Sequence, residues 1–316
     1  MTDIITASFA PSGANGAALS ARLRGELTHS LATIAAGLGR SPPVLPPGRL
    51  SAAVYARYFD LLHAVIADDP EAAGRALDAV EQVLLQPPPA FLRRWSDLAS
   101  DEAALFDRHI NVDPTTRVAL EAPAPGSAGQ ARDAIGAALS LLEAAAPELA
   151  AEIRALIGEI VLVAGGVNEN SLFDGATAFA CWGALFLNAD EHGDRIEAVD
   201  GLAHESAHAL LFGHTLGHPL VENGPDERHA SPLRADPRPL DGIYHATFVS
   251  ARMHHAHGRI LASGLLSAEE AARARDGLAS SRAAFADGHA TLQRHARMTP
   301  IGEKLMADAA AAMAAA

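Results

Sequence analysis

The sequence predicts a mainly α protein with a small β-sheet, and three observations support this fold class. Alanine, the strongest helix former, is abundant along all 316 residues, whereas aromatic residues amount to only 5%. Proline-rich breaks separate stretches of helical periodicity. Two short apolar runs in the middle of the chain are typical of strands. We therefore expect helical N- and C-terminal regions, and a zincin-like HExxH helix next to a short sheet.

The N-terminal part is expected to form helices divided by proline. Two breaks, SPPVLPPG at 41–48 and QPPPA at 86–90, cannot form the interior of a helix. Pro70 suits the first turn of a helix, where no backbone donor is lost. The expected helices are residues 16–38, 50–66, 70–85 and 91–107. We expect residues 1–125 to form a helical region that docks a peptide or its leader, and residues 126–316 to form a metal-dependent catalytic domain.

The middle of the chain is expected to change from helix to strand. Residues 110–128 are expected to be irregular, and residues 127–156 to be helical with an interruption near Pro147. EIVLVA at 159–164 is a β-branched run that predicts a strand. The run ATAFACWGALFLN at 176–188 is apolar at both alternating sets of positions, which favours a strand buried on both faces.

The helix that contains HExxH has predictable ends. Asp194 precedes Glu197 by three residues, as in a capping box, and Gly213 is expected to be the left-handed cap at the other end. Residues 214–238 are rich in proline, glycine and histidine and should form a loop, after which Pro239 can open another helix. Two further helices are expected at residues 267–297 and 300–315.

Charge and cysteine content exclude several classes of function. The formal net charge of −14 argues against binding to a nucleic acid backbone. With the single cysteine Cys181, neither an internal disulfide nor a thiolate metal cluster is possible. The first residues lack the pattern of a secretory signal, and no apolar run reaches the roughly 20 residues that span a bilayer. We expect a cytoplasmic protein that binds no membrane, in which a metal would be held by His, Asp or Glu.

The motif His204-Glu205-Ser206-Ala207-His208 predicts a metal site. Four residues advance a helix by a little over one turn, so the two imidazoles lie about 40° apart on the same face and can close on one ion. Glu205 lies about 100° around the helix, from where it can reach a metal-bound water or a neighbouring ligand. Two histidines do not make a tight site, so a third ligand is needed.

His245 is the third ligand that we expect, because it lies in the next predicted helix and a loop lets that helix fold back across the first. His214 has the metzincin spacing, but a continuous helix would turn it away from His208. Glu222 and Glu227 are carboxylate alternatives close behind the motif. The other histidines between residues 204 and 257 are expected to be exposed or in loops: His218, His229, His254, His255 and His257.

Arg234 and Arg238 form a second signal, because they flank an Asp-Pro turn and lead directly into the helix of His245. Arginine presents a planar fork that binds a carboxylate through two hydrogen bonds. Either arginine alone is best explained by ordinary ion pairing in an acidic protein. Two of them beside a proposed metal ligand favour the binding of an anionic substrate or cosubstrate.

At residues 168–255 the chain resembles the HExxH-type peptide-modification proteins, regarded as iron(II)- and 2-oxoglutarate-dependent β-hydroxylases of ribosomally synthesised precursor peptides. The resemblance rests on NSLFDGATAFACWGALFLN, AVDGLAHESAHALLF and SPLRADPRPLDGIYHATFVSAR. HExxH is shared with zincin peptidases. The more specific part is its pairing with R-x-D-x-R-P-L-x-G-x-x-H downstream.

The resemblance implies roles for individual residues. It implies that His204 and His208 hold the metal, that His245 is the third ligand, and that one of the loop arginines, Arg234 or Arg238, binds the carboxylate of 2-oxoglutarate. Dioxygen and a precursor peptide would be the other substrates, and Glu205 would orient a ligand or bound water. Three histidines depart from the triad of two histidines and one carboxylate usual for such iron enzymes. If a carboxylate is used instead, the nearby candidates are Asp236 and Asp241.

Two other functions are compatible with the motif. In a zinc metallopeptidase, Glu205 would be the general base, Tyr244 an oxyanion donor, and the apolar strand before the motif would pair with an extended peptide. In a non-catalytic protein, the N-terminal helices would bind a peptide and the metal site would be structural. Tightly bound zinc with peptide cleavage, or 2-oxoglutarate turnover, would distinguish these functions.

Overall fold

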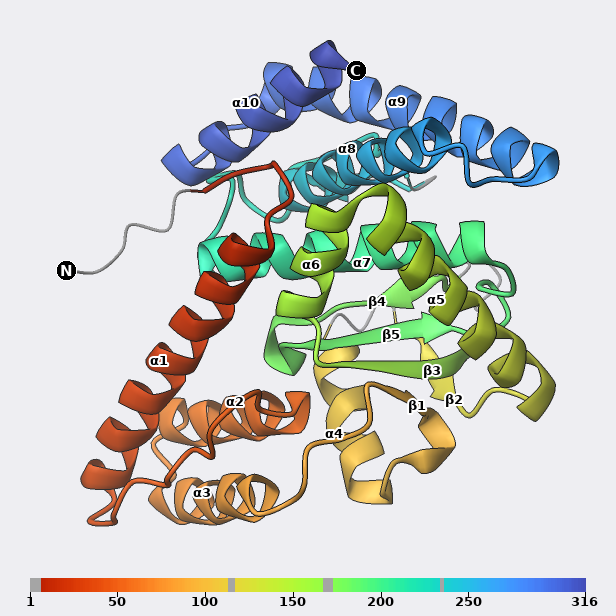
Figure 1. The fold of residues 1–316 in the computed structure, drawn as a ribbon. Coiled ribbons are helices and arrows are strands. Elements are labelled where there is room, and N and C mark those ends of the chain that lie inside the picture. Colours follow the sequence, from red (N-terminus) through yellow and green to blue (C-terminus); the bar gives the residue numbers. More distant parts are fainter. Residues whose placement is uncertain (1–6, 113–116, 167–172, 234–235) are drawn as a thin grey trace. The chain divides into compact units, whose positions relative to one another are not determined.

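The computed structural model describes residues 7–112, 117–166, 173–233 and 236–316, and its fold is mainly α with a small mixed sheet (Figure 1). Ten α-helices lie in this described part of the chain. The fold class predicted from the sequence is therefore confirmed.

The chain divides into two compact units made of interleaved segments. The first, which we call the HExxH unit, comprises residues 1–19, 133–155 and 194–316. The second, the sheet unit, comprises residues 20–132 and 156–193. The sequence had suggested one boundary near residue 125. The interleaving arises because strands from residues 156–193 hydrogen-bond to a strand from the N-terminal part.

In its described residues the sheet unit contains three helices of its own, of which the first two lie where proline and periodicity predicted them. They are α2 (Ala52–Ile66), α3 (Pro70–Leu84) and α4 (Ser100–Ile110), while α1 (Gly13–Gly37) and α5 (Pro125–Ala145) contribute residues to both units. Pro70 occupies the first turn of α3, and the side chain of Asp69 caps this helix by accepting a hydrogen bond from the Ala72 N–H at 2.8 Å.

The sheet has the strand order β1-β3-β5-β4, with β2 paired to β3. Its strands are β1 (Leu92–Arg94), β2 (Ala119–Glu121), β3 (Glu159–Gly166), β4 (Gly175–Ala176) and β5 (Ala184–Asn188). β3 is parallel to β1 and β5, whereas the β2–β3 and β4–β5 pairs are antiparallel. β5 is buried at every position, as its apolar pattern predicted.

Two predicted elements of the sheet unit were wrong in extent. Residues 91–97, expected to be helical, form β1 and a short 3₁₀ turn, because β3 supplies hydrogen-bond partners that the local sequence does not reveal. The run at 176–188 is not one strand. A 3₁₀ turn at Phe179–Cys181 and Gly183, whose φ is 91°, interrupt it, so only residues 184–188 pair with β3.

The HExxH unit is a set of packed helices in which α8 runs between α7 and the helices α9 and α10 (Figure 1). The bounds are α6 (Pro147–Leu156), α7 (Arg195–Thr215), α8 (Leu240–Ala262), α9 (Ala268–His295) and α10 (Pro300–Ala315), with two short paired strands, β6 (Arg228–His229) and β7 (Arg238–Pro239). The break at Pro147 and the two C-terminal helices agree with the sequence-based expectation.

The sequence predicted the start of α7 correctly but not its end. The side chain of Asp194 accepts hydrogen bonds from the backbone N–H groups of Ile196 and Glu197. The Glu197 side chain in turn accepts a hydrogen bond from the Asp194 N–H, which completes the capping box. At the other end Gly213 was the wrong cap. It is buried inside the helix, which continues to Thr215 and ends at Leu216 with φ 52°.

Candidate metal centre

Three imidazoles come together between α7 and α8. Helical spacing places His204 and His208 on one face of α7, where their Nε2 atoms lie 3.2 Å apart. His245, in the second turn of α8, brings its Nδ1 to 2.9 Å from the Nδ1 of His208. The rings of His208 and His245 are stacked at 5.1 Å between centroids. The structure thus places together the three residues that the sequence singled out as metal ligands.

The environment of His208 and His245 favours the neutral form of these two rings. Burial lowers the pKa of His208 well below its usual 6.5, and the proximity of His204 and His245 lowers it further. Burial also lowers the pKa of His245, although the carboxylate of Asp241, one turn earlier on α8, opposes this shift. Neutral imidazole keeps a lone pair on one ring nitrogen, and this is the form that binds a metal.

The donor chemistry of this cluster, and the separation of the nitrogens in each neighbouring pair, fit a metal ion. Two imidazole nitrogens bound at about 2.1 Å to one ion lie about 3.0 to 3.4 Å apart, close to the separations observed here. Within the described residues, however, no three His, Cys, Asp or Glu side chains converge on one point. His208 turns Nε2 toward His204 and Nδ1 toward His245, so one ring must turn before all three nitrogens can share an ion.

Glu205, the residue between the two motif histidines in the sequence, is buried with 5% of its surface exposed. Its position on α7 is about 100° around the axis from His204. A carboxylate so placed can act on a group bound at the cluster, as the sequence predicted for either an oxygenase or a peptidase.

Of the two arginines expected to bind an anion, the structure describes only Arg238. Arg234 lies outside the described residues. Arg238 lies on β7, and its Nε is 3.0 Å from the Asp236 carboxylate, with a further hydrogen bond of 3.2 Å from the guanidinium. The Cβ of Arg238 is 3.8 Å from the point where a Cβ on Gly242 would lie, which places Arg238 beside the first turn of α8. Asp236 is thereby engaged in an ion pair.

The other candidate ligands lie apart from this cluster or have other contacts. His214 is buried in the last turn of the continuous α7, about 240° around the axis from His208. Glu227 accepts a hydrogen bond from Asn223 at 2.9 Å and contacts His229 at 3.3 Å, which in turn stacks on His295. Asp241 is exposed at the start of α8, four residues before His245.

Tyr244 and two histidines of α8 differ from their predicted roles. Tyr244 is fully buried, and its hydroxyl donates a hydrogen bond of 2.8 Å to the Gly302 carbonyl, so it holds α10 rather than facing a substrate. His254 and His257 were expected to be exposed, but both are buried. They face α7 and α9, which the sequence did not reveal as neighbours of this stretch of α8.

One contact near the cluster was missed by the sequence analysis. Asp200 lies four residues before His204 on α7, and its Oδ1 is 2.8 Å from the Nε2 of the buried His257 on α8. The spacing of Asp200, His204 and His208, each four residues apart, was the signal that could have identified Asp200.

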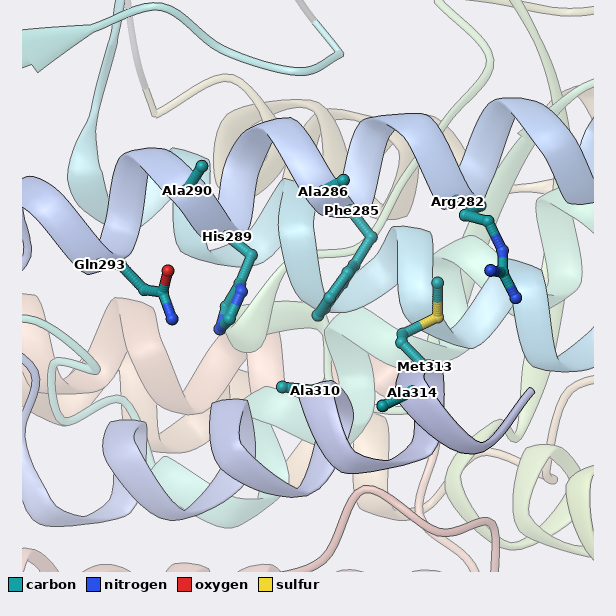
Figure 2. Close-up of a pocket in the computed structure, with 9 residues that line it drawn as sticks. All are labelled: Arg282, Phe285, Ala286, His289, Ala290, Gln293, Ala310, Met313 and Ala314. Carbon is teal, nitrogen blue, oxygen red and sulfur yellow. The ribbon is translucent and has the colours of Figure 1, made fainter.

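A separate groove of about 370 Å³ lies between α9 and α10 (Figure 2). The α9 side chains in it include Phe285 and His289, and Met313 lines it from α10. None of the proposed metal ligands lines this groove, so it is a different feature from the imidazole cluster.

In the described part of the chain, no helix combines the length and apolar character needed to cross a bilayer. No family model matches the chain, and no curated protein matches it either.

Proposed function

We propose that this protein is an iron(II)- and 2-oxoglutarate-dependent hydroxylase that acts on a β-carbon of a ribosomally synthesised precursor peptide in the cytoplasm. The observation that carries the proposal is the cluster of His204, His208 and His245 on α7 and α8. The Nε2 of His208 lies 3.2 Å from the Nε2 of His204, and its Nδ1 lies 2.9 Å from the Nδ1 of His245. The peptide substrate and the cosubstrate follow from the resemblance of the motifs to the peptide-modification proteins.

In this proposal the three imidazoles hold the iron. Bound iron, with 2-oxoglutarate and dioxygen, supplies the oxidising power that replaces an unactivated C–H bond by C–OH. The contribution of the chain is to fix the ligands on α7 and α8, which limits their motion more than loops would. The lowered pKa of His208 keeps its ring unprotonated near neutral pH and therefore available as a ligand.

Glu205 and Arg238 have supporting roles. The buried carboxylate of Glu205 orients a ligand or a bound water at the cluster. Arg238 lies next to the start of the helix that carries His245, and its guanidinium already binds one carboxylate, that of Asp236. A carboxylate of 2-oxoglutarate would have to take the place of Asp236 or bind the side of the guanidinium that Asp236 leaves open.

A zinc metallopeptidase is the second candidate. Three imidazole ligands, together with the glutamate of an HExxH motif, are also the residues that a zinc hydrolase uses. One feature of the described residues disfavours it. Tyr244, the expected oxyanion donor, is fully buried and bonded to the Gly302 carbonyl, so it would have to leave α10 to reach a substrate.

The two functions are separated by one assay. The protein is loaded with Fe(II) without oxygen, and succinate formation from 2-oxoglutarate is measured after air is admitted, with and without a mixture of candidate peptides. We expect succinate from the wild type, more of it and a peptide mass gain of one oxygen when the right peptide is present, and neither with His208→Ala. Tightly held zinc, peptide cleavage and no succinate would show the peptidase instead.

A further inference from the structure

The groove between α9 and α10 has no role in the proposed function (Figure 2). Its volume of about 370 Å³ lies within the range of about 300–1,000 Å³ that is usual for small-molecule sites. Phe285 and His289 point from α9 toward α10. Space remains between the two helices because four of the lining residues have the smallest side chain that carries a Cβ, namely Ala286, Ala290, Ala310 and Ala314.

The walls of the groove are mostly apolar and aromatic. The rings of Phe285 and His289 are stacked, with 5.2 Å between their centroids and 15° between their planes, and Met313 lies opposite them on α10. Burial lowers the pKa of His289, so this ring is uncharged at neutral pH. Such walls favour the apolar part of a ligand, because contact with them removes apolar surface from water.

Arg282 is the only charged residue among the described residues that line the groove. Its Nε donates a hydrogen bond of 3.4 Å to the Nε2 of His254, a buried histidine whose pKa is lowered chiefly by burial and which therefore accepts as neutral imidazole. Within the described part of the chain, Arg282 forms no ion pair with a carboxylate. The guanidinium is thus oriented by His254, and its other two nitrogens can bind the carboxylate of a ligand.

We propose that this groove binds a small carboxylic acid with an extended apolar body, of the kind of a medium-chain fatty acid. The carboxylate pairs with Arg282, and the apolar chain lies along Phe285 and Met313 toward Gln293. Arg282 and Gln293 are separated on α9 by about 16 Å of helix, so an extended molecule fits the groove better than a compact anion does. This site goes beyond the proposed function and does not involve the imidazole cluster, so either proposal can fail without the other.

The test is the binding of octanoate to the full chain, measured by isothermal titration at neutral pH, with octanamide as an uncharged molecule of the same length. We expect octanoate to bind more tightly than octanamide. Arg282→Gln should weaken octanoate binding by about five-fold, as for a well-aligned exposed ion pair, and leave octanamide binding unaltered. Arg282→Lys should recover part of the loss. The matched change Arg294→Gln, at an exposed arginine of α9 outside the groove, should alter neither.

Filling the groove tests where the ligand binds. Ala310→Phe should abolish the binding of both compounds, and Ala314→Phe replaces it if thermal unfolding shows that the first variant does not fold. Ala311→Phe, at an exposed residue of α10 outside the groove, should leave binding unaltered.

Three results would overturn the proposal. Equal binding of octanoate to the wild type and to Arg282→Gln would show that no carboxylate pairs with Arg282. Octanoate binding that survives the filling of the groove, or no saturable binding to the wild type, would show that the groove is not a site for this ligand. A dimer of the wild type that Ala310→Phe dissociates would make the groove an interface between two copies of the chain instead.

Discussion

Two groups of histidines, one in each unit, differ in what their nitrogens face. In the sheet unit, buried His109 stacks on His63 and places its Nε2 3.0 Å from the Asp60 carboxylate, which also binds Arg108. In the HExxH unit, His208 faces the nitrogens of two other imidazoles. A carboxylate satisfies an imidazole within the fold. Imidazole nitrogens that face each other need a shared proton or a shared metal ion, which is why the second group is the candidate site.

The largest expected effect is the loss of metal binding on His208→Ala. Removal of a ligand should weaken Co(II) or Zn(II) binding by more than about 100-fold, because loss of an outer partner alone costs 10- to 100-fold. His109→Ala is the matched control, and we expect it to leave metal affinity unchanged. Isothermal titration of both variants measures this. Equal effects of the two changes would remove the distinction between the two groups.

For the group around Asp60 and His109 we expect the reverse: a change there should affect stability and not metal affinity. Asp60→Asn should lower the free energy of unfolding by about 1–3 kcal/mol, because buried His109 and the guanidinium of Arg108 lose a charged acceptor. Urea unfolding of the metal-free protein measures this change. Metal affinity should stay at the wild-type value, and a fall in it would mean that the Asp60 group belongs to the metal site.

The pH dependence of stability should contain a contribution from Asp60. Burial alone would raise the pKa of Asp60, but hydrogen bonds from His109 and Arg108, with their charges, outweigh burial and lower it below 3.8. The unfolded chain then takes up a proton at higher pH than the folded protein does. The stabilisation is therefore complete above pH 3.8 and is lost as pH falls through the lowered pKa. Urea unfolding of the wild type below pH 4 should show a steeper loss than Asp60→Asn.

The smallest effect is expected for Tyr244→Phe, next to His245 in the sequence. This change removes one buried hydrogen bond to the Gly302 carbonyl and should cost about 1 kcal/mol of stability. Turnover and metal affinity should be unaltered, because the hydroxyl serves the fold, like Asp60, and not the cluster. A fall in kcat of about 100-fold, as for loss of an oxyanion donor, would favour the peptidase.

Much of the fold was predictable because its signals are local. Proline breaks, helical periodicity and the capping box of Asp194 and Glu197 act within one or two turns, so they indicated most helices and the start of α7. The same holds for His204 and His208, whose spacing alone places them on one face of a helix. Gly213 lies buried inside the helix, which continues to Thr215 and ends at Leu216 in the left-handed conformation, so the local preference of glycine did not decide where the helix ends.

The features that only the tertiary structure decided depend on contacts between residues that are distant in the sequence. β1 is a strand because β3 lies beside it, and residues 156–193 join the N-terminal helices for the same reason. The approach of His245 to His208, the burial of His257 and its contact with Asp200 all depend on how α8 packs between α7 and α9. Such packing is a property of many side chains at once, so no short pattern in the sequence encodes it.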